Sequence, residues 1–337
     1  KADLQLSVPF SRIYAKGSIS KILKWGWQGD FKPGALSMVD SFIILDFAKE
    51  VKLYAGGIKV PFELHSGIQS GWSYVMPNGP AYGSVVKLFS NPFSAEKLPG
   101  SGSRSPQVGV WGKIAAGMLK YYLYMVDGSD RTSTKDIKTG YGVRIEFAPT
   151  MAGYKGHPGY VLKETYLGKQ NTLSLGLSYA TQKMGGGYTY KIKDAAGNTI
   201  ANAAVDKMSA WAVDLLWEQN MGAVTPNISL GYMNKKFEWT TGGDDKQKGL
   251  IVQGQLLLNQ KTILGKPAVG ARYMQTDASD GSDDKESVIG VVGQLYVKGV
   301  GNRIALSVDR VKFDNGLVGT GAKDSYTDVT LALWYNF

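Results

Sequence analysis

Few side chains in this 337-residue sequence could carry out covalent chemistry or hold a metal ion. There are two histidines, His65 and His157, and no cysteine, so a catalytic triad or a histidine-rich metal site would have to use one of them. No phosphate-cradling glycine loop ends in Gly-Lys-Ser or Gly-Lys-Thr. The acidic run 277–284 resembles a calcium loop, but its glycine and glutamate spacings are wrong, which favours a solvated surface loop. The sequence therefore predicts no enzyme and no bound cofactor or metal.

Charged side chains at every second position of extended segments could instead control the passage of ions. Successive residues of a strand point to opposite faces, so such charges share one face. We expect one set to face a water-filled interior: Lys113, Lys120, Arg144, Glu146, Asp214, Lys235, Arg272, Arg303 and Asp309. They could set ion selectivity, or they could merely hydrate the wall and pair across strands. Both interpretations stay open.

The segment 325–337 is the clearest of the elements that would position these charges. Val329, Leu331 and Leu333 alternate with Asp328 and Thr330, and the apolar face ends in aromatic residues. A soluble sheet could bury such a face. Aromatic residues at a strand end are more typical of a transmembrane barrel, where they lie at the lipid–water boundary.

The same alternation recurs along most of the sequence. It is clear at 140–147, 172–180 and 208–218, and the first strand is predicted at Gly17–Gln28. About 14 such segments can be counted, and the length of the chain suggests about 16 strands, within a range of 14–18 and even in number. Mean hydropathy is −0.16, and no apolar window of about 18–20 residues predicts a transmembrane helix.

Connections between the segments are of two kinds. Short turns, such as 220–222 and 299–301, alternate with longer polar loops, such as 240–248, 277–285 and 314–323. Outer-membrane barrels have short periplasmic turns and long extracellular loops. Closure is expected because every backbone group in hydrocarbon must be paired. We therefore predict an all-β fold, a single transmembrane antiparallel β-barrel over 1–337 with a water-filled interior.

The stretch 61–106 contains the longest predicted loop and is rich in Gly, Ser and Pro. Loops of this length are commonly functional or disordered. We interpret it as a candidate constriction of the pore, or alternatively as an extracellular cap or a latch over a neighbouring subunit. Its charged or titratable members are Glu63, His65, Lys87, Lys97 and Arg104.

The net charge of +10 comes from basic residues that are scattered singly rather than in runs. This distribution argues against nucleic acid as a partner and is compatible with a barrel that attracts anions. The first residues contain no hydrophobic signal core, so any secretory peptide is expected to have been removed already.

Three stretches carry a family resemblance: LYAGGIKVPFELHSG at 53–67, TYLGKQNTLSLGLSYATQ at 165–182, and the terminal LWYNF. With these motifs the chain resembles the bacterial trimeric outer-membrane porins, most nearly the phosphate-selective O/P-type group. The resemblance implies a homotrimer in the lipid and lipopolysaccharide of the bacterial outer membrane. It also implies one pore per subunit and a long loop folded inside as a constriction.

The expected function is passive diffusion of small hydrophilic solutes and inorganic anions, with a modest anion preference. Two alternatives remain. One is a structural or scaffold barrel that holds a periplasmic or electron-transfer partner. The other is an outer-membrane enzyme barrel, which would need a Ser–His pair.

Overall fold

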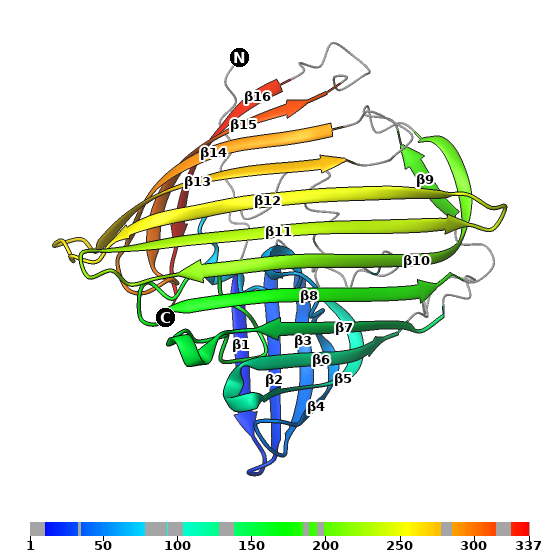
Figure 1. Cartoon of the computed structure of the whole chain (residues 1–337), viewed down its shortest axis with the longest axis horizontal. Coiled ribbons are helices and arrows are strands. Elements are labelled where there is room, and N and C mark those ends of the chain that lie inside the picture. Colours follow the sequence, from blue (N-terminus) through cyan, green and yellow to red (C-terminus); the bar gives the residue numbers. More distant parts are fainter. Residues whose placement is uncertain are drawn as a thin grey trace.

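The computed structural model contains one antiparallel sheet of sixteen strands (Figure 1). It describes residues 11–32, 35–77, 93, 104–127, 138–184, 189–193, 199–277, 285–314 and 325–336. The strands are β1 (Arg12–Ser18), β2 (Leu23–Lys32), β3 (Ala35–Asp46), β4 (Lys52–Lys59), β5 (Arg104–Ile114), β6 (Leu119–Val126), β7 (Gly140–Phe147), β8 (Thr172–Lys183), β9 (Thr189–Lys193), β10 (Thr199–Glu218), β11 (Val224–Trp239), β12 (Asp244–Leu258), β13 (Lys266–Asp277), β14 (Lys285–Tyr296), β15 (Arg303–Phe313) and β16 (Ser325–Trp334). The helical turns are η1 (Leu64–Ile68), η2 (Gly71–Ser73), η3 (Ala115–Gly117) and η4 (Thr150–Ala152).

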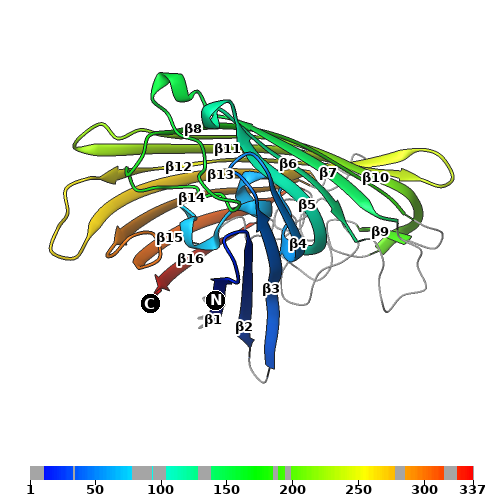
Figure 2. The same ribbon diagram turned by 90° about the horizontal axis from the view of Figure 1, so that it is seen from below.

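Strands pair with their neighbours in chain order from β1 to β16, except that β9 pairs only with one end of β10. The continuous path therefore holds fifteen strands, with β9 as the sixteenth. Figures 1 and 2 show this sheet wrapped around an interior, with β1–β4 steeply inclined to β8–β12. Such rotation is the accumulated twist between neighbouring strands. The predicted all-β fold of about 16 antiparallel strands is confirmed.

The two edges of the sheet differ from the prediction of an even, closed ring. Antiparallel neighbours alternate in direction, so β1 and β16, the first and last of fifteen, run the same way. No pairing joins β1 to β16 within the ranges given above.

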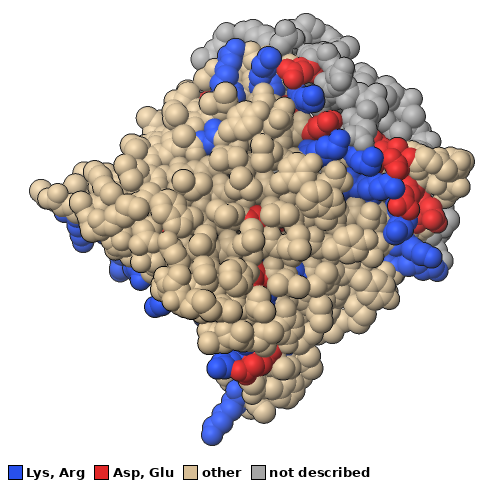
Figure 3. Space-filling view, viewed as in Figure 1, with Lys and Arg blue, Asp and Glu red and all other residues tan. Residues whose placement is uncertain are grey.

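The two faces of the wall follow the alternation read from the sequence. On β16, Leu331 and Leu333 are about 70% exposed (68% and 71%), whereas on β10 the inward Asp214 is 2% exposed. Figure 3 shows the consequence: a broad outer face over β7–β14 is nearly free of charge, and Lys, Arg, Asp and Glu gather at the strand ends. An uncharged band bordered by charged rims is what a wall in contact with lipid requires.

The inner face is less polar than predicted. Toward the long-loop ends of β10–β15 it carries fully buried apolar side chains, namely Met208, Met233, Phe237, Ile251, Met274, Val288 and Val311. The predicted water-filled interior did not include these apolar side chains. Alternation predicts which side a residue faces but not what covers it.

The connections show the predicted asymmetry with two exceptions. A tight turn at 240–243, with Gly242 and Gly243 at positive φ, replaces the expected long loop 240–248. Conversely, the long connection 148–171 follows β7 at the end where the other turns are short.

The predicted first strand, Gly17–Gln28, is wrong because a turn at 19–22 divides it between β1 and β2. This turn contains no Gly, Pro or Asn. Instead, the hydroxyl oxygen of Ser20 accepts hydrogen bonds from the backbone N–H groups of Ile22 and Leu23.

Across the described residues, no helix is long and apolar enough to cross a membrane.

Candidate functional site

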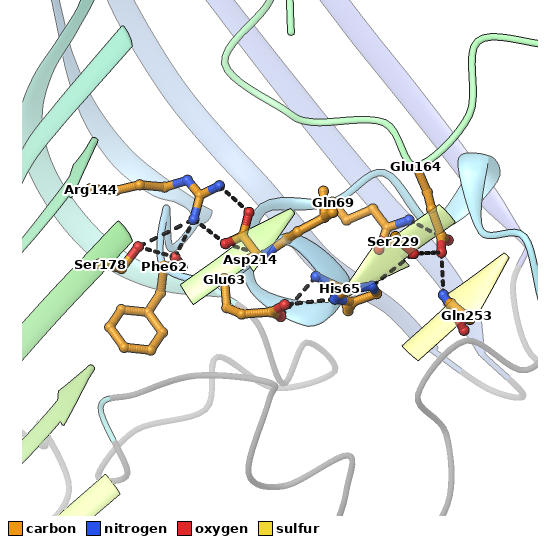
Figure 4. Close-up of polar contacts among 11 residues, drawn as sticks. Phe62, Glu63, His65, Gln69, Arg144, Glu164, Ser178, Asp214, Ser229 and Gln253 are labelled. Atoms are coloured by element: carbon orange, nitrogen blue, oxygen red, sulfur yellow. Dashed lines mark hydrogen bonds and ion pairs between the residues drawn. The ribbon is translucent and has the colours of Figure 1, made fainter. Parts of the chain in front are cut away.

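Two connecting segments fold away from the wall into the interior. We call residues 60–77, after β4, the first inner segment, and residues 148–171, between β7 and β8, the second inner segment. They contact each other through a parallel bridge between Gln69 and Leu162, where Ser70 N–H donates to the Leu162 carbonyl at 2.9 Å. The candidate site is the polar network that fastens both segments to the wall (Figure 4).

An arginine clamp holds the beginning of the first inner segment. The Arg144 guanidinium on β7 donates to both carboxylate oxygens of Asp214 on β10, at 2.6 and 2.8 Å. Its Nη1 also donates to the Phe62 carbonyl at 2.8 Å, and Asp214 accepts from Leu64 N–H at 3.3 Å. Because Arg144 is fully buried, this bidentate pair is a strong constraint on the backbone at Phe62.

His65, on the first inner segment, lies between the carboxylate of Glu63 and the hydroxyl of Ser229. Its Nδ1 is 2.6 Å from Glu63 Oε1, and its Nε2 is 3.0 Å from the hydroxyl of Ser229 on β11. Ser229 donates its own proton to Glu164 at 2.8 Å, so it can only accept from His65. Both ring nitrogens therefore donate, which makes His65 an imidazolium.

The electrostatics of His65 agree with this assignment. Burial lowers its pKa, but the Glu63 carboxylate, with Glu164 and Asp214 farther away, more than offsets burial, and the net pKa is raised above 6.5.

The series Glu63, His65, Ser229 has the order of an acid, base and nucleophile, but its protons run the wrong way for catalysis. A nucleophilic serine must give its proton to a neutral histidine. Here His65 donates to Ser229, which is fully buried. The arrangement is a charged anchor for the first inner segment.

Two buried carboxylates fasten the second inner segment. Glu164 accepts from Gln69, Gln253, Ser229 and the backbone N–H of Val75. The second carboxylate belongs to Glu218 at the end of β10. It accepts hydrogen bonds from Thr165, Asn227 and the backbone N–H groups of residues 166 and 168. Donors surround each carboxylate, which is the condition for keeping a charge out of water.

His157, on the second inner segment, has the opposite environment. Its Nδ1 accepts from the Tyr166 hydroxyl at 2.7 Å. Burial is the main cause that lowers the pKa of His157 to about 3, and the cations of Lys120 and Arg144 add to it against the opposing effect of Glu146. His157 is therefore neutral.

The nine residues predicted to line the interior all lie on the inward face. Lys113 is half-buried and the other eight are buried. Among the arginines, Arg272 pairs with Asp309 at 2.8 Å, and Arg144 contacts Glu146 at 3.1 Å in addition to Asp214. Their role along a conduction path stays a prediction.

The lysines of this set differ in their partners. The Lys120 ammonium is 3.7 Å from Glu146 and donates to the Gly159 carbonyl. The ammonium of Lys235 lies over the ring of Phe237, 5.2 Å from its centroid.

The predicted loop 61–106 is partly described. Glu63 and His65 belong to the first inner segment, while Lys87 and Lys97 lie outside the described residues. Arg104 is not a loop residue: it begins β5, pairs with Lys59 of β4, and its guanidinium contacts Asp40 at 2.5 Å. The prediction failed at that boundary because loop composition gave no signal of where β5 resumes.

The sequence interpretation missed Glu164, Gln69, Ser229 and Gln253 as members of the site. Inward glycines were the available signal, since glycine inside a strand often marks a close approach. A Cβ on Gly231 would collide with Oε1 of Glu63, and one on Gly176 would collide with Nη2 of Arg144. In the part of the chain described here, no group of three His, Asp or Glu residues is arranged to hold a metal ion.

Solved structures of bacterial porins share this architecture. The anion-selective porin from Comamonas acidovorans aligns with 96% of this chain and 85% of its own, at a TM-score of 0.56 and 16% identity. This chain has a porin-like β-barrel fold. OmpT of Vibrio cholerae (TM-score 0.53, 10% identity, 96% and 84% covered) shares this porin-like fold. Salmonella typhi OmpF in complex with daunomycin shares it as well, at a TM-score of 0.52 and 12% identity, with 96% of this chain and 89% of that chain covered. The predicted β-barrel fold is confirmed.

Sequence comparison adds less. No family model matches the chain. An uncharacterized protein of Aquifex aeolicus (strain VF5) is 27% identical over 217 residues, which is 58% of this chain and 46% of that protein. The chain thus matches about half the length of this curated relative.

Proposed function

We propose that this porin-like barrel is a channel of the bacterial outer membrane for passive diffusion of small hydrophilic solutes and ions. The observation that carries the proposal is the division of the wall into an apolar outer face and an inner face bearing charged residues. An aqueous pathway through a membrane requires a polar lining inside an apolar band.

We further propose a modest preference for anions. The chain carries a net charge of +10, and Lys113, Lys120, Lys235, Arg272 and Arg303 face inward. The summed excess of positive charge raises the local concentration of anions. The likeness to the anion-selective porin from Comamonas acidovorans supports the same direction.

The first inner segment, with Glu63 and His65, is the proposed constriction. Its support is the anchoring to Arg144, Asp214 and Ser229, which fixes it across the interior. Homotrimerisation and kinship with the phosphate-selective O/P-type porins are parts of the same proposal. Cross-linking in detergent tests the trimer, and the permeability of phosphate relative to chloride tests the kinship.

Reconstitution in planar bilayers under a KCl gradient tests the channel. We expect steady conductance and a reversal potential of the sign that marks chloride as the more permeant ion. A cation-selective reversal potential would overturn the anion preference alone. A barrel that inserts but passes no current would overturn the channel.

A scaffold barrel is the second candidate, because the level of Arg144, His65 and Glu164 is packed so densely that all three are fully buried. A scaffold of this kind would pass no current and would co-purify in stoichiometric amount with a periplasmic or electron-transfer partner.

A further inference from the structure

One buried arginine differs from the others on the inward face. Arg144 and Arg272 each contact a carboxylate directly. Arg303, the first residue of β15, is 1% exposed. Among the described residues, no carboxylate pairs with it, and its guanidinium nitrogens Nε and Nη2 have no hydrogen-bond partner. A buried charge without a partner is costly, so an unsatisfied guanidinium requires an explanation.

The third nitrogen fixes the orientation of this guanidinium. Nη1 donates to the Tyr74 carbonyl of the first inner segment, to Gln294 Oε1 at 3.2 Å and to the Tyr296 hydroxyl at 3.3 Å. The Cζ atom lies over the Trp334 ring, 4.0 Å from the ring centroid. The aromatic rings of Trp334 and Tyr296 attract the cation, but none of these partners carries a negative charge.

Nε and Nη2 share one edge of the guanidinium, and their N–H bonds point in nearly parallel directions. This edge matches two oxygens of one carboxylate or phosphate, and such bidentate pairs are the strongest hydrogen bonds that arginine makes. A single chloride ion would accept both hydrogen bonds at bent angles, whereas two oxygens let both be nearly linear.

We propose that Arg303 is a binding site for a small oxyanion, carboxylate or phosphate, held by Nε and Nη2. The proposal rests on the proposed channel and names a selectivity residue within it. The site lies at the short-turn end of the barrel, where Trp334 on the edge strand β16 is only partly buried. An anion would reach Arg303 past this ring.

Binding to the purified full-length chain in detergent tests the site without any need for transport. Isothermal titration with acetate and with phosphate, at constant ionic strength in chloride, identifies which oxyanion binds. Arg303→Lys keeps the positive charge but loses the paired Nε and Nη2 donors. We therefore expect roughly tenfold to hundredfold weaker oxyanion binding. Arg303→Gln should abolish it.

Arg310→Gln is the matched control, since Arg310 lies on the same strand but is exposed and contacts Ser325 and Thr327. It should bind as the wild type does. Oxyanion binding unchanged in Arg303→Lys, or absent from the wild type, would overturn the site. A barrel that binds oxyanions through Arg303 but passes no current would overturn the channel and leave the site intact.

Discussion

The two inner segments each bring one of the chain's two histidines into the interior, and the two histidines have opposite charge states. His65, on the first segment, lies between Glu63 and Ser229 and is protonated. His157, on the second, accepts from Tyr166 near Lys120 and Arg144 and is neutral. Both are almost completely buried.

Burial alone therefore does not determine how these residues behave. Desolvation acts in the same direction on both, toward the neutral form, and the neighbouring charges decide the outcome. The first segment is fastened by charge, whereas the second combines a neutral histidine with the buried carboxylate of Glu164. Four experiments test this contrast.

The largest effect should follow from Asp214→Asn. This change leaves the buried Arg144 without its bidentate partner and removes one of the carboxylates that keep His65 charged. Breaking a buried ion pair from one side costs about 3–5 kcal/mol. Urea unfolding in detergent, followed by tryptophan fluorescence, measures the loss. An unchanged midpoint would show that the clamp does not hold the segment.

Acidification should weaken the fold through His157. The folded pKa of about 3 lies below the unfolded value of about 6.5, so the unfolded chain takes up the proton first. Stability is fully present above pH 6.5 and is lost as the pH falls toward 3. As the pH falls across this range, the melting temperature should decline more steeply for the wild type than for His157→Gln. The variant serves as the control, because its decline comes from the other titratable groups alone. Parallel curves would refute the neutral assignment.

Alkaline conditions should act through His65 with the opposite sign. Its pKa is raised on folding, so its stabilisation is present below about pH 6.5 and is lost as the pH rises through the folded pKa. In NMR spectra of a histidine-labelled His157→Gln chain, the single remaining signal should titrate above 6.5. A signal that titrates below that value would mean that Glu63 does not outweigh burial.

The smallest effect is expected at the rim, for Lys236→Ala. Lys236 contacts Asp244 at 2.9 Å and Glu238 at 3.3 Å, but about one third of each side chain remains open to solvent (34–35%). Water screens such pairs, so the urea midpoint should not change measurably. A loss comparable to that of Asp214→Asn would mean that exposed and buried ion pairs contribute equally in this barrel.

The sequence predicted the strands of the barrel wall better than the two inner segments that the wall surrounds. Alternation at 140–147, 172–180 and 325–334 is a local property, so the faces of Arg144 and Asp328 could be assigned without a fold. The partners of Arg144 could not be assigned in this way, since Asp214 and the Phe62 carbonyl are distant in the chain. The role of the segment 148–171 was not predicted, because nothing local marks Glu164 as an anchor.

The inner segments also start from opposite rims. The first follows β4 from the long-loop end, the second follows β7 from the short-turn end, and they join at Gln69 and Leu162. At this junction Ser70 N–H donates to the Leu162 carbonyl and the Gln69 amide donates to Glu164. A displacement of either segment must therefore break these hydrogen bonds or carry the other segment along.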